Sequence, residues 1–453
     1  MQEPMNLPSS RSISRFYIEN LGCAKNQVDA EEMIKALELQ GFLFTDDPEN
    51  ADLIIVNTCG FIGPAKEESI DTLFEFRQAY PDKKIILAGC LAQRYGREMD
   101  LPEADGIFGN KSPALITEAV ERLMGSERPV FIPEGAYHSV GRERLLGFKG
   151  SAYLKIAEGC DNNCSYCAIP LIRGGVSSRG IEDIAGEFSS LVGRGVFEIN
   201  LIAQDLASFG IDRTPDGELV PLLRRLSQVD GDFWIRLLYI HPDRFPDGLF
   251  SVMREDPRII PYFDVPFQHA SPPILSSMGR KPGFDDNLNL IARIRGEFPE
   301  SIIRTTFLLG YPGETEADLE VLMDFQARAR FDWLGCFVYS REEGTRAYSL
   351  ANDRELVKTA RRAEEYKSWI EELQVGITAS QLDRFTGKEM RLLVEERVDG
   401  DDGESLYICR GYPHAPEVDG AVVLHGRGLS EGDTVVARVI RRNGFDLEAI
   451  PFV

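Results

Sequence analysis

The chain has 453 residues, with 50 Lys and Arg against 73 Asp and Glu, so its formal net charge is −23. At about 150 residues per domain, this length predicts roughly three domains, each large enough to bury a core without disulfides. The acidic balance argues against a protein that binds bare phosphate backbones, and no apolar run approaches the roughly 18 residues of a membrane span.

The first residues and the cysteine content suggest where the protein works. Residues 1–13 lack the apolar core of a secretory signal and are expected to form a disordered tail. Eight Cys residues without an export signal indicate the reducing cytoplasm, where clustered thiols are more often metal ligands than disulfides.

Residues 14–130 alternate apolar runs with helical patterns, which is typical of an open parallel α/β sheet. The predicted strands at 16–18, 53–56 and 85–87 are each followed by one cysteine: Cys23, Cys59 and Cys90. Because the carboxyl ends of parallel strands share one edge, we expect these three thiols to converge. Three unrelated buried thiols are the alternative.

Residues 131–150, with one Pro and four Gly, are predicted to be a linker, and a second strand–helix alternation fills residues 151–350. Its six predicted strands favour a partial (β/α)6 barrel over a complete eight-unit one. They are Ala152–Ile156, Glu198–Ile202, Trp234–Tyr239, Phe263–Phe267, Ile302–Leu309 and Leu334–Tyr339. Residues 351–381 form a charged helical connector, and the short strands in 382–453 predict a small antiparallel β-barrel or sandwich.

The strongest chemical signal is a loop after the first of these strands, which carries Cys160, Cys164 and Cys167 within eight residues. Three thiolates on one loop can hold three corners of an iron–sulfur cube. Because a [4Fe–4S] cluster normally takes four ligands, one iron would stay open for a substrate or cofactor. A zinc site is the alternative, but it needs a fourth ligand nearby.

The Cys-x3-Cys-x2-Cys spacing resembles the radical S-adenosylmethionine (SAM) superfamily, in which the open iron binds SAM and an electron cleaves it to a 5′-deoxyadenosyl radical. The resemblance implies that strand ends line the SAM site. Gln204 and Asp205 occupy the place where the superfamily usually carries Gly-Gly-Glu for the SAM amine, so the amine-binding atom is left open. The other residues implied as cofactor-binding are Tyr166, Arg236, Gln268, Gly310, Gly313 and Glu314.

Three cysteines after three strands, then this barrel, then a β domain similar to the TRAM module, resemble the radical-SAM methylthiotransferases. Matching segments include residues 20–26, 57–59, 88–90, 172–174 and 268–269. The family implies a second [4Fe–4S] cluster on Cys23, Cys59 and Cys90, which carries the sulfur to be inserted.

Members of this family differ in substrate. Residues 57–62, 65–69 and 415–420 resemble the branch that modifies an aspartate β-carbon in ribosomal protein S-twelve of the small subunit, free or assembled. Residues 382–453 hold 14 acidic and 9 basic residues, net −5, and the run from Glu395 to Glu404 is mostly acidic. Such a surface favours a basic protein over tRNA, although a solvated acidic hairpin without function is an equal alternative.

Two other functions stay open at this point: a tRNA-adenosine methylthiotransferase, and a non-catalytic iron–sulfur electron carrier or ribosome-binding protein. The resemblance implies further partners, namely an electron donor such as a flavodoxin and a sulfur donor. We expect a monomer with no membrane partner. Cys336 and Cys409 have no cysteine neighbour in the sequence and are predicted to be buried structural thiols.

Overall fold

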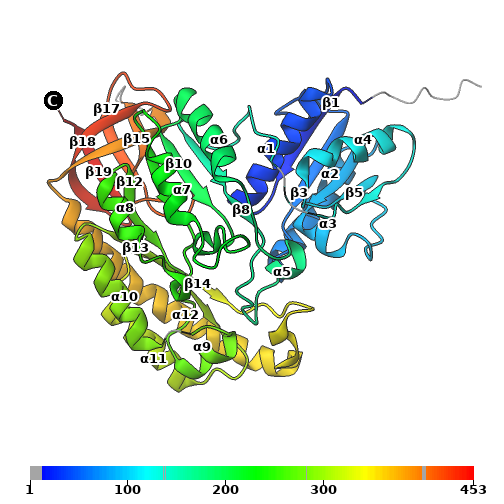
Figure 1. The fold of residues 1–453 in the computed structure, drawn as a ribbon. Helices are drawn as coiled ribbons and strands as arrows, with labels where there is room; N and C mark the ends of the chain where they lie inside the picture. The colour runs from blue at the N-terminus through cyan, green and yellow to red at the C-terminus, as the bar shows by residue number, and fades with distance from the viewer. Residues whose placement is uncertain (1–12, 136, 138, 282, 400–404, 453) are drawn as a thin grey trace, which may run out of the picture. The chain divides into compact units, whose positions relative to one another are not determined.

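The computed structural model describes residues 13–452 except 136, 138, 282 and 400–404, and the chain divides into two compact units (Figure 1). The first unit is the chain up to Leu146 together with Leu171–Gly174, and the second is the remainder. The predicted tail lies outside the described residues except for Ile13, which is buried in the core of the first unit. The finer division into six segments stays a prediction.

A six-stranded parallel sheet forms the centre of the first unit, in the order β2-β1-β3-β4-β5-β6. Its strands are β1 (Arg15–Asn20), β2 (Leu43–Phe44), β3 (Leu53–Thr58), β4 (Lys84–Gly89), β5 (Gly106–Phe108) and β6 (Val130–Phe131). The predicted parallel sheet is confirmed, and the three predicted strands are β1, β3 and β4, which lie next to one another. The other three are only two or three residues long, too short to show a period of two.

Helices cover both faces of this sheet. They are α1 (Ala24–Leu39), α2 (Gly63–Ala79), α3 (Cys90–Tyr95) and α4 (Ile116–Met124). Successive side chains of a strand point to opposite faces. Ile55 of β3 accordingly belongs to one buried cluster with Ile34 of α1 and Val120 of α4, whereas Ile54 belongs to another with Leu73 of α2. Burial on both faces explains why β3 is a continuous apolar run.

An open six-stranded parallel sheet forms the centre of the second unit, in the order β14-β13-β12-β11-β10-β7. Its strands are β7 (Ser151–Lys155), β10 (Glu198–Ile202), β11 (Trp234–Leu237), β12 (Ile259–Asp264), β13 (Ile302–Leu309) and β14 (Trp333–Val338). The partial barrel is confirmed, but the predicted fourth strand begins four residues too late. Pro261 lies inside β12, where prolines are disfavoured, and the β11–β12 register shifts there.

The helices of the second unit follow the predicted alternation, and the long connector is confirmed as one helix. They are α6 (Ile181–Gly193), α7 (Leu219–Leu226), α8 (Leu249–Glu255), α9 (Pro272–Met278), α10 (Phe284–Glu297), α11 (Glu316–Ala329) and α12 (Asp353–Leu382). The short helix α5 (Ile169–Ile172) is divided, because its last two residues belong to the first unit. A capping box starts α12, because Asn352 and Glu355 bind each other's backbone N–H groups. This helix packs against β14 and α11.

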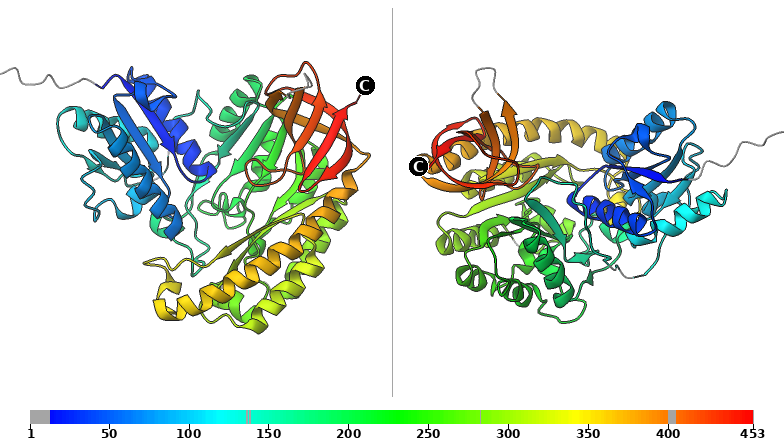
Figure 2. Two further views of the ribbon diagram at one scale, coloured as in Figure 1. Left: turned by 180° about the vertical axis from the view of Figure 1, so that it is seen from behind. Right: turned by 90° about the horizontal axis from the view of Figure 1, so that it is seen from above.

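The chain ends in a closed five-stranded barrel (Figure 2). Its strands are β15 (Glu389–Asp399), β16 (Ser405–Gly411), β17 (Val422–Gly426), β18 (Thr434–Asn443) and β19 (Asp446–Pro451). The predicted small β-barrel is confirmed, with one difference: β17 and β19 pair in parallel, so the barrel is not purely antiparallel. The sequence analysis also does not predict β19.

A buried ion network joins this barrel to the open sheet within the second unit. Glu198 at the start of β10 pairs with Arg236 of β11 (Oε1–Nη2 2.7 Å) and with Arg410 of β16, which also pairs with Glu395 of β15 (2.6 Å). The loop between β16 and β17 adds the Tyr412 carbonyl oxygen, which accepts a bond from Arg236 Nη1 (2.9 Å). The two β structures therefore share one polar interior.

Glu198→Gln is expected to destabilise the second unit strongly, because it leaves two buried guanidinium groups without their shared carboxylate. Breaking such a pair costs about 3–5 kcal/mol, measurable as a lower denaturant midpoint in urea unfolding. Burial alone would raise the pKa of Glu198, but Arg410 and Arg236 outweigh it and lower the pKa to about 2. Its contribution should therefore be complete above about pH 4.5 and disappear as the pH falls towards 2.

The matched control for this substitution is Glu182→Gln, which breaks an exposed ion pair with Arg225 and should change the midpoint little. Equal midpoints for Glu198→Gln and the unchanged protein would contradict the prediction.

Among the described residues, no helix is long and apolar enough to cross a membrane.

Candidate active site: two cysteine triads

The first triad lies at the carboxyl ends of three adjacent strands of the first unit. Cys23 precedes α1, Cys59 follows β3, and Cys90 is the first residue of α3. The three loops approach closely: a Cβ added to Gly22 would lie 3.1 Å from the Cβ of Cys59. One added to Gly60 would lie 2.8 Å from the carbonyl carbon of Cys90. The structure thus brings the three predicted residues together.

The thiols of this triad differ in burial. Cys23 is exposed, Cys59 is half-buried and Cys90 is buried. Burial, with the nearby Cys90 and Cys23 adding to it, raises the pKa of Cys59 to about 12. Burial also raises the pKa of Cys90, whereas the positive charge of Arg173 opposes that rise. These groups would ionise readily only with added positive charge, which a bound metal centre supplies.

Side-chain donors surround the Cys90 sulfur. Asn110 Nδ2 donates to Sγ at 3.1 Å and Arg173 Nη2 donates at 3.2 Å. The amide of Asn26 fixes the surrounding loops, because its Nδ2 donates to the carbonyl oxygens of Leu21 (3.0 Å) and Thr58 (2.9 Å). Hydrogen bonds to a ligating sulfur are a common means of tuning iron–sulfur clusters.

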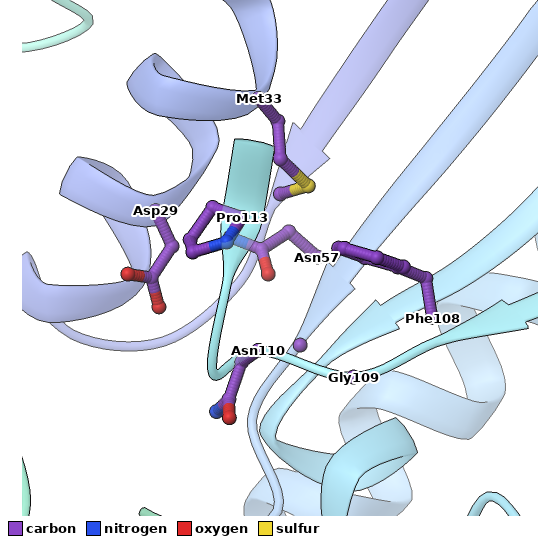
Figure 3. A pocket seen from close by; sticks show the side chains of 8 residues that line it. Asp29, Met33, Asn57, Phe108, Gly109, Asn110 and Pro113 are labelled. Atoms are coloured by element: carbon purple, nitrogen blue, oxygen red, sulfur yellow. The ribbon is translucent and has the colours of Figure 1, made fainter. Parts of the chain in front are cut away.

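A narrow gap between side chains lies beside this triad in the first unit (Figure 3). It is lined by Asp29, Met33, Asn57, Gly89, Phe108, Gly109, Asn110 and Pro113. The space is too narrow to hold a water molecule. Gly89 occurs here with φ +94°, and a Cβ at this position would lie 2.6 Å from Asn57 Oδ1. The pocket is therefore a packing gap behind Cys90 rather than a substrate site.

The second triad lies on the loop that follows the small strand β8 (Ala157–Glu158). The backbone N–H of Cys167 donates to the carbonyl oxygen of Cys164 (3.1 Å), and Asn163 between Cys160 and Cys167 has φ +54°. Burial, with the neighbouring thiols, raises the pKa of Cys160 to about 11 and that of Cys167 to about 12. This loop also holds its three predicted thiols together.

Two residues that the sequence analysis does not single out lie against Cys164. Arg280 Nη1 is 4.0 Å from its sulfur and donates to the Tyr166 hydroxyl (3.3 Å), so Tyr166 is placed beside the triad. His241 Nε2 lies 4.0 Å from the same sulfur. Burial, with the charges of Arg280 and Arg244, lowers the pKa of His241 to about 2, so the imidazole is neutral. Neither residue carries a sequence signal, since a single Arg or His is common in any helix or loop.

Asp205 lies near the cysteine loop, but its carboxylate already accepts hydrogen bonds from the protein. It accepts bonds from Asn162 Nδ2 (2.8 Å), Ser208 Oγ (2.6 Å) and the backbone N–H groups of Ala207 and His241 (both 3.0 Å). Asp205 therefore organises the loop that carries the cysteines.

The neighbouring Gln204 presents a free acceptor. Its Nε2 donates to Glu158 Oε1 (2.6 Å), and Lys155 fixes the other oxygen of Glu158 (3.0 Å). This fixes the orientation of the amide, and Gln204 Oε1 is buried with no hydrogen-bond partner in the described part of the chain. A buried unpaired acceptor is costly and indicates a missing donor.

The remaining predicted residues of this site lie after β12 and β13. Gln268 has φ +68° and bridges to Phe307, while Gly310 and Gly313 have φ +72° and +88°. Glu314 accepts from the Gly310 N–H (2.8 Å), and its other oxygen lies 3.4 Å from Nε2 of the buried His269. These contacts place the residues at strand ends, as the sequence analysis expects.

Arg236 is not brought to the cysteine loop. It is fully buried, pairs with Glu198 and lies 4.5 Å from the ring of Tyr262. As the third residue of β11 it points into the interface with the C-terminal barrel, so its guanidinium is occupied there. We leave it out of the candidate site. Cys336 and Cys409 are buried and outside both triads, as predicted.

Each triad offers three thiols, which are the usual ligands of an iron–sulfur cluster. In each triad, at least one of the three sulfurs also has a hydrogen-bond donor near it. Within the described residues, no group of three or more His, Cys, Asp or Glu is arranged to hold a single metal ion.

Fold and site together define a radical-SAM protein, and residues 154–325 match the family model of the Radical SAM superfamily. Residues 15–109 match Uncharacterized protein family UPF0004, and residues 386–451 match the TRAM domain. TsrM, a radical SAM methyltransferase of Kitasatospora setae solved with cobalamin and a [4Fe–4S] cluster bound, has the same fold (TM-score 0.53, 16% identity, covering 74% of this chain and 76% of that one).

Curated relatives extend the likeness to nearly the whole chain. The Ribosomal protein uS12 methylthiotransferase RimO of Treponema denticola is 43% identical, covering 95% of this chain and 99% of that protein. The protein of the same name from Thermotoga maritima is 40% identical, covering 96% and 99%. The chain belongs to the RimO family of radical-SAM methylthiotransferases. It is therefore an enzyme of that class, which sets aside the non-catalytic electron carrier.

Proposed function

We propose that the protein attaches a methylthio group to the β-carbon of an aspartate in ribosomal protein uS12 (S-twelve), with SAM and two [4Fe–4S] clusters as cofactors. The relatives named for this activity match at least 95% of the chain. The observation that carries the proposal is the presence of one cysteine triad in each unit. With two triads, one cluster can supply the sulfur while the other forms the radical.

The six cysteines divide between the two tasks. Cys160, Cys164 and Cys167 would hold the SAM-binding cluster, and Cys23, Cys59 and Cys90 the sulfur-carrying one. When bound and reduced, SAM and its cluster supply a radical that removes hydrogen from an unactivated C–H bond, which no side-chain base can do.

The chain's own residues would orient SAM at the strand ends. Gln204 Oε1 is the atom we assign to the SAM amine, because it is the buried acceptor without a donor while Asp205 is saturated. Tyr166 would pack beside the cluster, fixed by Arg280. The loops that begin at Gln268 and Gly310, with Gly313 and Glu314, would bring backbone groups near the adenine.

The run from Glu395 to Glu404, which the sequence analysis expects to bind a basic protein, begins with a residue that is not a free surface charge. Glu395 pairs with Arg410, and burial raises its pKa, so it belongs to the buried network. Asp401, Asp402 and Glu404 lie outside the described residues. The choice of uS12 over tRNA is therefore supported by kinship rather than by this run. We also propose an electron donor such as a flavodoxin, a sulfur donor and a monomeric state.

The test is to incubate the anaerobically reconstituted protein with SAM, dithionite and a sulfide source, together with either purified uS12 or tRNA. We expect mass spectrometry to show a methylthio group on one aspartate of uS12, since the relatives are named for that protein. The control is uS12 with that aspartate changed to alanine, which should stay unmodified. Modification of tRNA adenosine instead of uS12 would support the other branch and overturn the proposal.

A further inference from the structure

A four-residue segment of the chain, Leu171–Gly174, belongs to the first unit although the residues on both sides belong to the second. Its Arg173 is 5% exposed. The guanidinium makes three bonds within the first unit: Nη1 to Asp29 (2.8 Å), and Nη2 to Asn26 Oδ1 (2.8 Å) and to Cys90 Sγ (3.2 Å). The segment therefore delivers a positive charge to one thiol of the first triad.

The placement of this cation is well defined. The side chains of Arg173 and Asp29 are 2% and 1% exposed, so neither charge is stabilised by bulk water. Asp29 neutralises the guanidinium on one side and aligns its other nitrogen with Cys90. Because charge-assisted bonds strengthen where water is excluded, a contact of 3.2 Å to sulfur is significant here.

The three thiols of the triad are not equivalent in this respect. The Cys90 sulfur has two side-chain donors, Arg173 and Asn110. The Cys59 sulfur is bonded by the backbone N–H of Phe61, and Cys23 is exposed. The charge of Arg173 acts on both Cys59 and Cys90, but only the Cys90 sulfur accepts a hydrogen bond from its guanidinium.

We propose that Arg173 is a positioning residue that holds the Cys90 sulfur and raises the reduction potential of the cluster bound by the first triad. The proposal rests on the function proposed above, which assigns that triad as cluster ligands. Reduction adds one negative charge, and a fixed cation next to a ligating sulfur stabilises the reduced form more than the oxidised one. Hydrogen bonds to sulfur and local charge are known determinants of cluster potential.

In the second triad, the nearest guanidinium lies farther from the sulfur than Arg173 lies from Cys90. Arg280 lies 4.0 Å from Cys164 Sγ and divides its bonds between Tyr166 and the carbonyl oxygen of Pro266. The guanidinium is therefore closer to a thiol in the first triad than in the second.

The experiment uses the full chain with Cys160, Cys164 and Cys167 replaced by Ala, so that only the first cluster forms. Arg173→Gln and Arg173→Lys are made in this background, reconstituted anaerobically and titrated with dithionite and redox mediators while the EPR signal is recorded. We expect Arg173→Gln to lower the reduction equilibrium constant at least tenfold, about 59 mV for a one-electron couple. Arg173→Lys keeps the charge but not the fork of donors, so a smaller shift is expected.

The matched control is Arg142→Gln. Arg142 forms an equally buried ion pair with Glu31, which lies on α1 like Asp29, and both side chains are 1% exposed. Arg142→Gln should lower the stability of the protein without changing the reduction potential of the cluster. If Arg173→Gln loses its iron while Arg142→Gln keeps it, the positioning role is supported. The reduction potential is then measured on Arg173→Lys instead.

An unchanged potential in Arg173→Gln with full iron content would overturn the inference. So would equal iron loss in Arg142→Gln, because that result would make Arg173 merely structural. Absence of iron from the background protein itself would instead contradict the assignment of the first triad, and with it the proposed function.

Discussion

Replacing Cys160, Cys164 and Cys167 together by Ala is expected to remove about half of the bound iron and to abolish reductive cleavage of SAM. Each cubane carries four irons, so a reconstituted chain should fall from about eight irons to about four. SAM cleavage should be undetectable, because the open iron that binds SAM is lost with the cluster. Iron analysis and chromatographic detection of 5′-deoxyadenosine provide the two measurements.

Cys336→Ala is the control for this substitution, because Cys336 is a buried thiol of the same unit outside the triad. It should keep about eight irons and full SAM cleavage. If the triple variant also kept about eight irons, the assignment of a cluster to the loop after β8 would be wrong.

Replacing Cys23, Cys59 and Cys90 together is expected to separate the two halves of the reaction. SAM cleavage should continue, because the second triad lies on a different unit and keeps its own contacts with Tyr166 and Arg280. Formation of methylthiolated uS12 should be abolished, since the carrier of the inserted sulfur is gone. Both products are measured in one incubation, which makes each an internal control for the other.

Cys409→Ala, which removes a buried thiol outside the triads, should retain both products. Continued methylthiolation in the triple variant would contradict the role of the first triad as sulfur carrier. Loss of both products would indicate that the first triad is needed for radical formation as well.

The fold could be predicted where burial produces a regular sequence pattern. β10 and β13 are predicted to the residue, because apolar and β-branched residues make up most of each strand. β2 and β6 have two residues each and take their shape from neighbouring strands, so a local pattern cannot show them. β12 is displaced because its Pro261 argues against a strand, although the sheet accommodates it.

The candidate site could be predicted as far as its spacing is local or follows from topology. Cys160, Cys164 and Cys167 lie on one loop, and the first triad follows from equivalent places in a parallel sheet. The contacts of Arg173 and Arg280 could not be predicted in this way, although residues 172–174 match the family, because their partners are far away in the sequence. Asp29 is 144 residues from Arg173.

Arg236 is predicted from the sequence to bind the cofactor, but the structure places it in the buried ion network. Its position on a strand of the partial barrel suggests a site residue, but the sequence does not reveal that the β16–β17 loop contacts its side chain. The Tyr412 carbonyl oxygen and Glu198 satisfy its guanidinium there. A prediction from one domain therefore fails where another domain supplies the partners.

The assignment of Leu171–Gly174 to the first unit also affects the order in which contacts can form during synthesis. A ribosome synthesises about 5–20 residues per second, so Arg173 is added on the order of ten seconds after Asp29, from which it is 144 residues distant. During that interval Arg173 is not yet available to pair with the Asp29 carboxylate. The ion pair between Arg173 and Asp29 in the first unit can therefore form only after residues 147–170 of the other unit have been synthesised.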